Sequence, residues 1–107
     1  MTFYIKQNDT VPSIRAELLN GSGSPVDLIN ASVRFHMRKA RGGTALVDSD
    51  ALVISEPDGV VQYDWVAEDT VEIGSYEAEF EVTYPDGTIE TFPNNEYIRV
   101  QIIDDIT

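Results

Sequence analysis

The stretch GSYEAEFEVTYPDGTIETF, residues 74–92, consists of two runs of alternating apolar and polar side chains joined by the turn sequence PDG. Alternation with a period of two is the pattern of a β-strand with one buried face. The apolar face of the longer run is formed by Tyr76, Ala78, Phe80 and Val82, and its opposite face by Glu77, Glu79 and Glu81. The stretch therefore predicts two strands with an acidic outer face.

The same alternation recurs along the rest of the chain. Alternating or short apolar runs also cover residues 14–18, 31–38, 51–54, 61–65 and 98–102, separated by turn-forming sequences such as NGSGSP, PDG and PNN. The segment KARGGTALVDSD at 39–50 is rich in glycine and charge, which predicts a loop. No sustained helical period is present, so the sequence predicts an all-β fold of about seven or eight short strands in a single domain over 1–107.

The segment EIGSYEA at 72–78 favours a sandwich over a small barrel. In immunoglobulin-like sandwiches a tyrosine precedes the second core cysteine by two residues, and its hydroxyl bonds to upstream backbone at a corner between strands. Tyr76 and Ala78 fit these two positions, with alanine in the place of the cysteine. The sequence thus predicts an antiparallel immunoglobulin-like β-sandwich, and the alternative is that Tyr76 is an ordinary core aromatic.

The charge of the chain restricts its partners. The formal net charge is -12, which argues against nucleic acid because phosphate binding needs a basic surface. Six of the seven basic residues lie in residues 1–41, whereas sixteen of the nineteen acids lie in 42–107. This asymmetry indicates either two faces of opposite sign or an acidic surface with one basic loop. No apolar run is long enough for a bilayer and the N-terminus lacks the features of a secretory signal, so we expect neither membrane insertion nor export by that route.

Candidate catalytic groups are few. The only histidine, His36, is an outward residue of a predicted strand, and no triad can be built around it. The nineteen acids guarantee that some carboxylate pair has a separation suited to glycoside hydrolysis, so such a pair carries no information. We therefore expect no enzymatic activity and no cofactor.

Binding of a structural calcium ion is a more specific hypothesis than catalysis. Asp48 and Asp50 lie two residues apart, and calcium accepts roughly six to eight oxygen ligands. The other acids that could contribute are Asp58, Asp64, Asp104 and Asp105. No spacing matches an EF-hand, and aspartates in such segments more often bond their own backbone in turns, so we assign no metal ligands.

Two charged groups are candidate contacts with a partner protein. They are the basic residues Arg38, Lys39 and Arg41 and the acidic row Glu77, Glu79 and Glu81. The negative charges of this row are neutralised either within the chain, by Arg34, Arg38 or Arg99 on neighbouring strands, or by a basic partner protein.

A resemblance to a known family rests on motifs along nearly the whole chain. They are the successions FYIKQNDTVPSIRAEL, PVDLINASVRFHMRKA, GVVQYDWVAEDTVEIGSYEAEFEVTYPDGTIETFP and YIRVQI. Their recognisable positions are Asp9, Thr10 and Pro12; Val26, Asp27 and Leu28; Ala31, Val33, Arg34 and Phe35; Trp65; and Gly74 and Tyr76 through Thr91, Phe92 and Pro93. The sequence resembles the N-terminal domain family of phage baseplate upper proteins.

The resemblance implies an immunoglobulin-like sandwich that attaches a longer protein, carrying receptor-binding parts, to the phage tail tip. This sequence reaches Thr107 without such parts, so we expect a stand-alone attachment module. The expected function is a structural protein of a tailed-phage virion, assembled in the host cytoplasm. It would be an adaptor or decoration that binds other phage proteins of the baseplate, tail, neck or capsid in a symmetric multi-copy assembly.

The alternative is a carbohydrate-binding or host-surface adhesion module. Sugar recognition usually requires exposed aromatic side chains beside polar groups. The candidates are Tyr4, Tyr84 and Tyr97, which lie near the ends of predicted strands.

Overall fold

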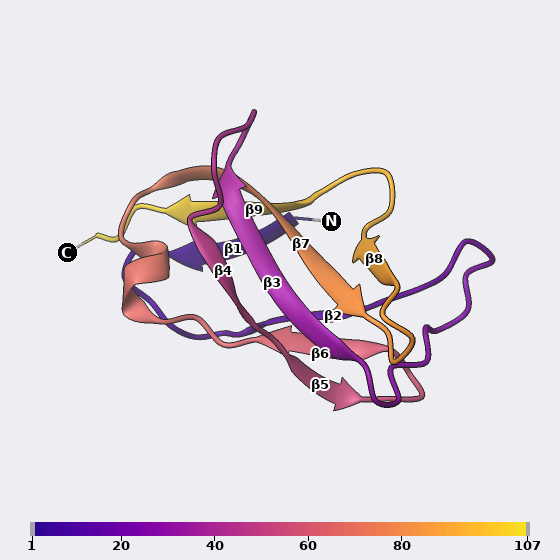
Figure 1. Cartoon of the computed structure of the whole chain (residues 1–107). Coiled ribbons are helices and arrows are strands. Elements are labelled where there is room, and N and C mark those ends of the chain that lie inside the picture. The colour runs from indigo at the N-terminus through magenta and orange to yellow at the C-terminus, as the bar shows by residue number, and fades with distance from the viewer. Residues whose placement is uncertain (1, 107) are drawn as a thin grey trace.

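The structure is a computed structural model that describes residues 2–106, and within them it is a β-sandwich (Figure 1). The elements are β1 (Thr2–Lys6), β2 (Ile14–Glu17), β3 (Ser32–Lys39), β4 (Val47–Asp50), β5 (Leu52–Ser55), β6 (Val60–Tyr63), the 3₁₀ helix η1 (Ala67–Thr70), β7 (Gly74–Thr83), β8 (Ile89–Phe92) and β9 (Ile98–Ile103). One sheet has the order β1-β9-β7-β3-β4 with β8 also paired to β7, and the other has the order β2-β6-β5. The predicted all-β sandwich is therefore confirmed.

The strand β7 organises the larger sheet. On one side it pairs with β3 over eight residues, from Tyr76 to Thr83. On its other side β9 pairs with the first half of β7, and β8 pairs with the second half. The ten residues of β7 pair with three strands, and this pairing requires a regular alternation of side chains along β7.

The core lies between the two sheets and consists of the inward side chains of both. Phe35 is fully buried at its centre, stacked on Tyr63 at 4.5 Å between ring centroids and edge-on to Trp65 at 5.6 Å. Trp65 is buried as predicted, although its strand ends earlier, at Tyr63. The apolar residues of β7 are buried and its glutamates are not, so the predicted faces of the strand are confirmed. Burial of large aromatic groups at this centre stabilises the packing of the two sheets.

The tyrosine corner predicted from EIGSYEA is present. Tyr76 is 3% exposed, and its hydroxyl donates a hydrogen bond of 2.6 Å to the backbone carbonyl of Glu72. Burial raises the pKa of Tyr76 above its usual value of 10.0, so the hydroxyl keeps its proton to higher pH than in an exposed tyrosine. Tyr76 is therefore both a core aromatic and the residue that fixes the chain where it enters β7.

The structure differs from the sequence prediction at the edge formed by residues 47–55. The loop predicted for 39–50 ends early, because Val47–Asp50 forms β4 and pairs with β3. At Ala51 the chain leaves this sheet, and β5 then joins β6 in the other sheet. Short strands with one buried side chain leave too weak a pattern to be recognised from the sequence, and Val47 is the only buried residue of β4.

A second difference concerns the first strand. The structure has nine strands within residues 2–106, and β1 was not among those predicted. It pairs with β9 in parallel, whereas the other named strand pairs are antiparallel. Ile5 is the only buried side chain of β1, so this edge strand also lacks a strong alternating pattern.

Candidate functional site

The outer face of the larger sheet brings the two predicted charged groups together. In the β3–β7 register, Arg38 lies opposite Glu77, His36 opposite Glu79, and Arg34 opposite Glu81. Side chains directly opposite each other on neighbouring strands are within reach of one another. The acidic row of β7 therefore faces a basic row on β3.

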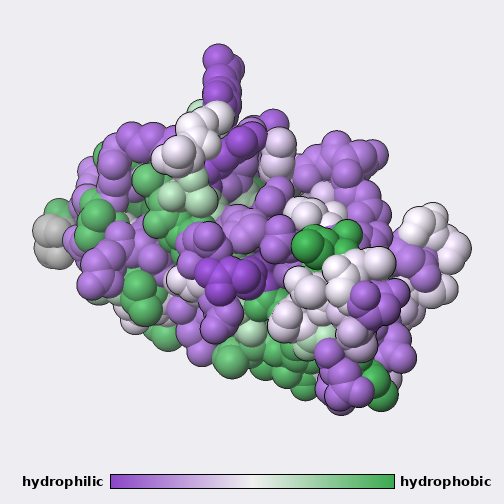
Figure 2. Space-filling model, in the orientation of Figure 1, coloured by the Kyte–Doolittle hydropathy of each residue, from purple (hydrophilic) through white to green (hydrophobic). Residues whose placement is uncertain are grey.

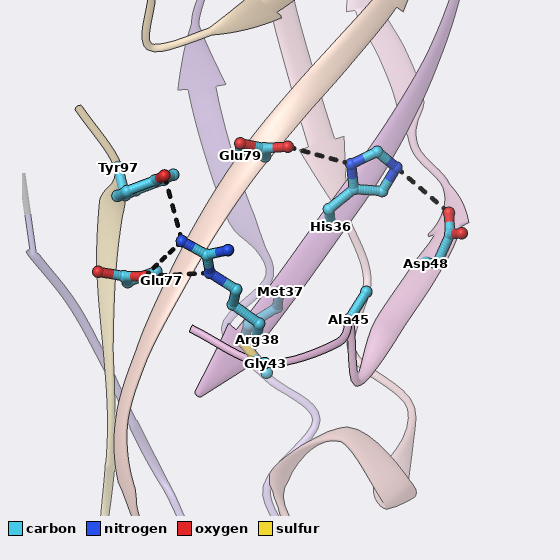
Figure 3. Close-up of a pocket in the computed structure, with 9 residues that line it drawn as sticks. All are labelled: His36, Met37, Arg38, Gly43, Ala45, Asp48, Glu77, Glu79 and Tyr97. Carbon is cyan, nitrogen blue, oxygen red and sulfur yellow. Dashed lines mark hydrogen bonds and ion pairs between the residues drawn. The ribbon is translucent and has the colours of Figure 1, made fainter. Parts of the chain in front are cut away.

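Arg38 contacts residues of two other chain segments on this face. Its guanidinium donates to the Glu77 carboxylate at 3.1 Å and to the Tyr97 hydroxyl at 3.1 Å (Figure 3). The same guanidinium lies 5.1 Å from the centroid of the Tyr97 ring, a cation–π distance. The hydrogen bond to Glu77 raises the pKa of Arg38 above its usual value. Arg38 thus links β3 to β7 and to the β8–β9 connection.

His36 lies between two carboxylates from different strands. Its Nδ1 is 3.3 Å from Glu79 of β7, and its Nε2 is 3.2 Å from Asp48 of β4 (Figure 3). The outward direction predicted for His36 is confirmed. Its two ring nitrogens are both engaged with carboxylates of this sheet.

Arg34 binds the two aspartates of β4. Its guanidinium donates to Asp48 at 2.8 Å and to Asp50 at 2.8 Å. The hydrogen bond from Arg34 lowers the pKa of Asp48 below its usual value of 3.8. The expectation that these aspartates bond their own backbone in a turn was therefore wrong, since they lie on a strand and accept from an arginine.

The remaining predicted contact residues lie in different surroundings. Lys39, at the end of β3, forms an ion pair with Glu72. Arg41 is exposed in the turn between β3 and β4, with a φ of 72°, and this hairpin projects from the body of the molecule (Figures 1 and 2). For Arg41 and Glu81 the structure gives no ion pair within residues 2–106.

A hollow of about 400 Å³ lies over this face, next to the β3–β4 hairpin. Its lining residues are His36, Met37, Arg38, Gly43, Ala45, Asp48, Glu77, Glu79 and Tyr97 (Figure 3). The lining contains no serine, threonine, cysteine or lysine, so it offers no Ser–His or Cys–His pair for nucleophilic catalysis. Its charged groups stabilise the sheet by pairing with one another.

The other candidate ligands and aromatics do not gather into a site. No cluster of three or more potential metal-ligating residues occurs within residues 2–106. Of the acids considered for calcium, Asp58 accepts from Ser55, and Asp64 accepts from Ser13 and Gln62. Hydrogen bonds from Ser13 and Gln62 also lower the pKa of Asp64.

The three tyrosines considered for sugar binding belong to different parts of the fold. Tyr4 is exposed on β1, Tyr97 covers Arg38, and Tyr84, at the end of β7, donates to Glu90 at 2.8 Å. They form no shared aromatic platform in this arrangement. A separate finding is that the described part of the chain has no helix with the length and apolar character needed to cross a membrane.

The sequence pattern did not reveal several of these interactions. The ion pairs of Arg34 with Asp48 and Asp50 require β4, which was predicted as loop. The contact between Arg38 and Tyr97 joins residues that are 59 positions apart. The available signal was the alternation of charge in RFHMRK and VDSD, which fits two strands of one hairpin.

A β-sandwich supports many unrelated functions, so the fold alone does not assign one to this chain. The comparison with protein families is more specific. Residues 3–105 match the family model of the BppU N-terminal domain, and the chain belongs to this family of phage baseplate upper proteins. The resemblance stated from the sequence motifs is thereby confirmed. Family membership implies a structural component of the phage baseplate, and hence of the virion.

The solved structures add support for the fold. The crystal structure of CopC from Methylosinus trichosporium OB3b has a TM-score of 0.57 to this chain at 14% sequence identity, and the match covers 99% of this chain and 87% of that chain. At this identity the similarity concerns the fold alone. No curated protein matches the chain at a significant level.

Proposed function

We propose that the chain is a non-enzymatic structural module of a tailed-phage virion, an adaptor or decoration that binds neighbouring baseplate, tail, neck or capsid proteins. The observation that carries this proposal is the family match over residues 3–105. The module would be assembled with its partners in the host cytoplasm, in a symmetric arrangement of many copies.

An apolar end of the sandwich supports an attachment role. Exposed aliphatic residues occur in the segments around η1, in the β1–β2 connection, at the end of β9 and after it: Val11, Val66, Val71, Ile73, Ile103 and Ile106. Hydrogen bonds join these segments, from Gln7 to the carbonyls of Val71 and Ile103. Figure 2 shows hydrophobic residues exposed at this end, on the side of the C-terminus. Removal of such side chains from water against a partner is favourable by about 25 cal/mol per Å², which offsets the entropic cost of association.

The charged residues proposed as contacts divide into two groups. Arg38, Lys39, Glu77 and Glu79 are engaged within the sheet, so a partner would have to replace existing interactions. Arg41 is exposed at the projecting hairpin, and Glu81 lies on the outer face of β7. We therefore propose Arg41 and Glu81 as the charged residues available to a neighbouring protein.

Mass spectrometry of purified particles tests the proposed function. The protein should be present, and its copy number relative to the major capsid protein should distinguish a repeated tail or capsid component from a ring at the baseplate or neck. Arg41→Glu should lower incorporation, whereas Arg41→Lys, which keeps the charge, should not. Absence of the wild-type protein from particles would refute the virion function.

A further inference from the structure

A second, more apolar groove lies between the two sheets, on the side away from η1. One wall is formed by residues 16–21, the end of β2 and the turn that follows, and the other by residues 92–98, the β8–β9 connection. The groove has a volume of about 540 Å³. Leu18, Phe92 and Ile98 are buried at its base, whereas Leu19 is 42% exposed on its wall. A groove of this kind accommodates an apolar side chain.

The strand beside the groove has an unpaired edge. β2 is the outer strand of the sheet β2-β6-β5, so it has a neighbour on one side only. The amide of Leu18 donates to the Gly59 carbonyl at 2.8 Å, and Ala16 lies opposite Val61 of β6. Because hydrogen-bonded positions alternate along an antiparallel strand, the backbone groups of Arg15 and Glu17 point away from β6. Within residues 2–106 they have no backbone partner, so they can pair with an added strand.

The charge around the groove favours a basic occupant. Glu17 and Glu96 are exposed residues of the two walls, and neither forms an ion pair within residues 2–106. The exposed C-terminal segment of a second copy would bring Asp104 and Asp105 beside its Ile106, and these acids would be repelled. The charges therefore favour a different protein over a second copy of this chain.

We propose that β2 and this groove bind an extended segment of a neighbouring protein, which adds a strand to β2 and inserts an apolar side chain flanked by lysine or arginine. Backbone hydrogen bonds to Arg15 and Glu17 provide the pairing, and the groove selects the side chain. The inference deepens the proposed attachment role and rests on it for the source of the segment, a virion protein. The segments that form the groove, residues 16–21 and 92–98, lie toward the end of the molecule opposite η1, as required of an adaptor with two partners (Figure 1).

Two substitutions at Glu17 separate strand pairing from charge. Glu17→Pro removes an amide that points away from β6, so it blocks an added strand while leaving the β2–β6 bonds in place. Glu17→Gln keeps the amide and removes only the charge. In purified particles we expect Glu17→Pro to reduce incorporation at least about tenfold, and Glu17→Gln to reduce it by no more than about threefold, the effect of one exposed charge.

A second pair of variants tests the groove without changing a strand backbone. Leu19→Glu places a charge on the groove wall, and Leu52→Glu is its control, because Leu52 is 50% exposed on β5 at the opposite edge of the same sheet. Only Leu19→Glu should reduce incorporation, and thermal unfolding of the purified variants should verify that both fold. A photo-crosslinking amino acid at position 19 should then attach, in particles, to a basic and apolar segment of a different protein.

The outcomes distinguish this inference from the proposed function. If the wild-type protein is absent from particles, the virion function fails, and the inference fails with it. If the wild type is present but Glu17→Pro and Leu19→Glu are incorporated at the wild-type level, only the inference is overturned. Crosslinks from position 19 to another copy of the same chain would likewise overturn it.

Discussion

Gly59 is the position at which the structure predicts the largest effect of adding a single methyl group. It is the last residue of the turn between β5 and β6 and has a φ of +64°. A Cβ placed there would lie 2.8 Å from the Leu18 carbonyl oxygen, 2.8 Å from the Val26 carbonyl oxygen and 3.1 Å from the Val26 amide nitrogen. All three are backbone atoms, and two of them are already joined in a hydrogen bond, since the Val26 amide donates to the Leu18 carbonyl. Removal of the clash therefore requires movement of three chain segments.

The expected cost of Gly59→Ala follows from two contributions. A left-handed backbone costs a non-glycine residue about 1–2 kcal/mol. Overpacking against atoms that cannot rotate away costs about 1–3 kcal/mol more. The free energy of unfolding should thus fall by about 2–5 kcal/mol, which corresponds to a decrease in Tm of at least about 8 °C for a domain of this size.

Gly87→Ala is the matched control. Gly87 also has a positive φ, +89°, but a Cβ there would meet no atom within 4 Å. The smaller entropy of the unfolded chain affects both alanine variants alike and cancels in their difference. Urea titration followed by the fluorescence of Trp65, the only tryptophan, gives both unfolding free energies. Equal losses in the two variants would refute the argument that close backbone contact at Gly59 determines its cost.

Three further predictions concern individual side chains. Tyr76→Phe removes the bond to the Glu72 carbonyl and should lower the unfolding free energy by about 1–2 kcal/mol; an unchanged urea midpoint would contradict a stabilising corner. Burial raises the pKa of Tyr84 to about 12, so its hydroxyl ionises at lower pH in the unfolded chain than in the folded protein. The unfolding free energy should therefore decrease as pH rises from about 10 to 12, and it should decrease less steeply in Tyr84→Phe. Arg34 lowers the pKa of Asp48, so the ion pair contributes folding stability that is lost as pH falls through the pKa of Asp48 in the folded protein. Arg34→Gln should raise the pKa of Asp48 measured by NMR titration, and an unchanged pKa would exclude Arg34 as the cause.

The strands and their faces were largely predictable because alternation is a local property. Burial of Phe80 and Val82 beside a half-buried Glu81 follows from side-chain direction in any strand, whatever its neighbours. The corner residue Tyr76 was also predictable, since its acceptor Glu72 is only four positions away. Strands with a single buried residue, such as β4, were missed because their pattern is too short to distinguish from a loop.

The charged face was only partly predictable, because its ion pairs join strands that are distant in sequence. The sequence indicated that the acidic row needs basic partners, and Arg38 was among the candidates. Which base meets which acid depends on the β3–β7 register and on the presence of β4. No local sequence pattern indicates this register, and Tyr97, which contacts Arg38, belongs to a third segment.

The amino-acid sequence by itself determined the all-β class, the inward and outward faces of the main strands, the tyrosine corner and the family. Each of these follows from side chains a few positions apart or from motifs in chain order. The tertiary structure decided the parallel pairing of β1 with β9, the passage of the chain from one sheet to the other at Ala51, and the groove beside β2. These features join segments distant in sequence, so they arise only when the whole core packs and fixes which edges and side chains meet.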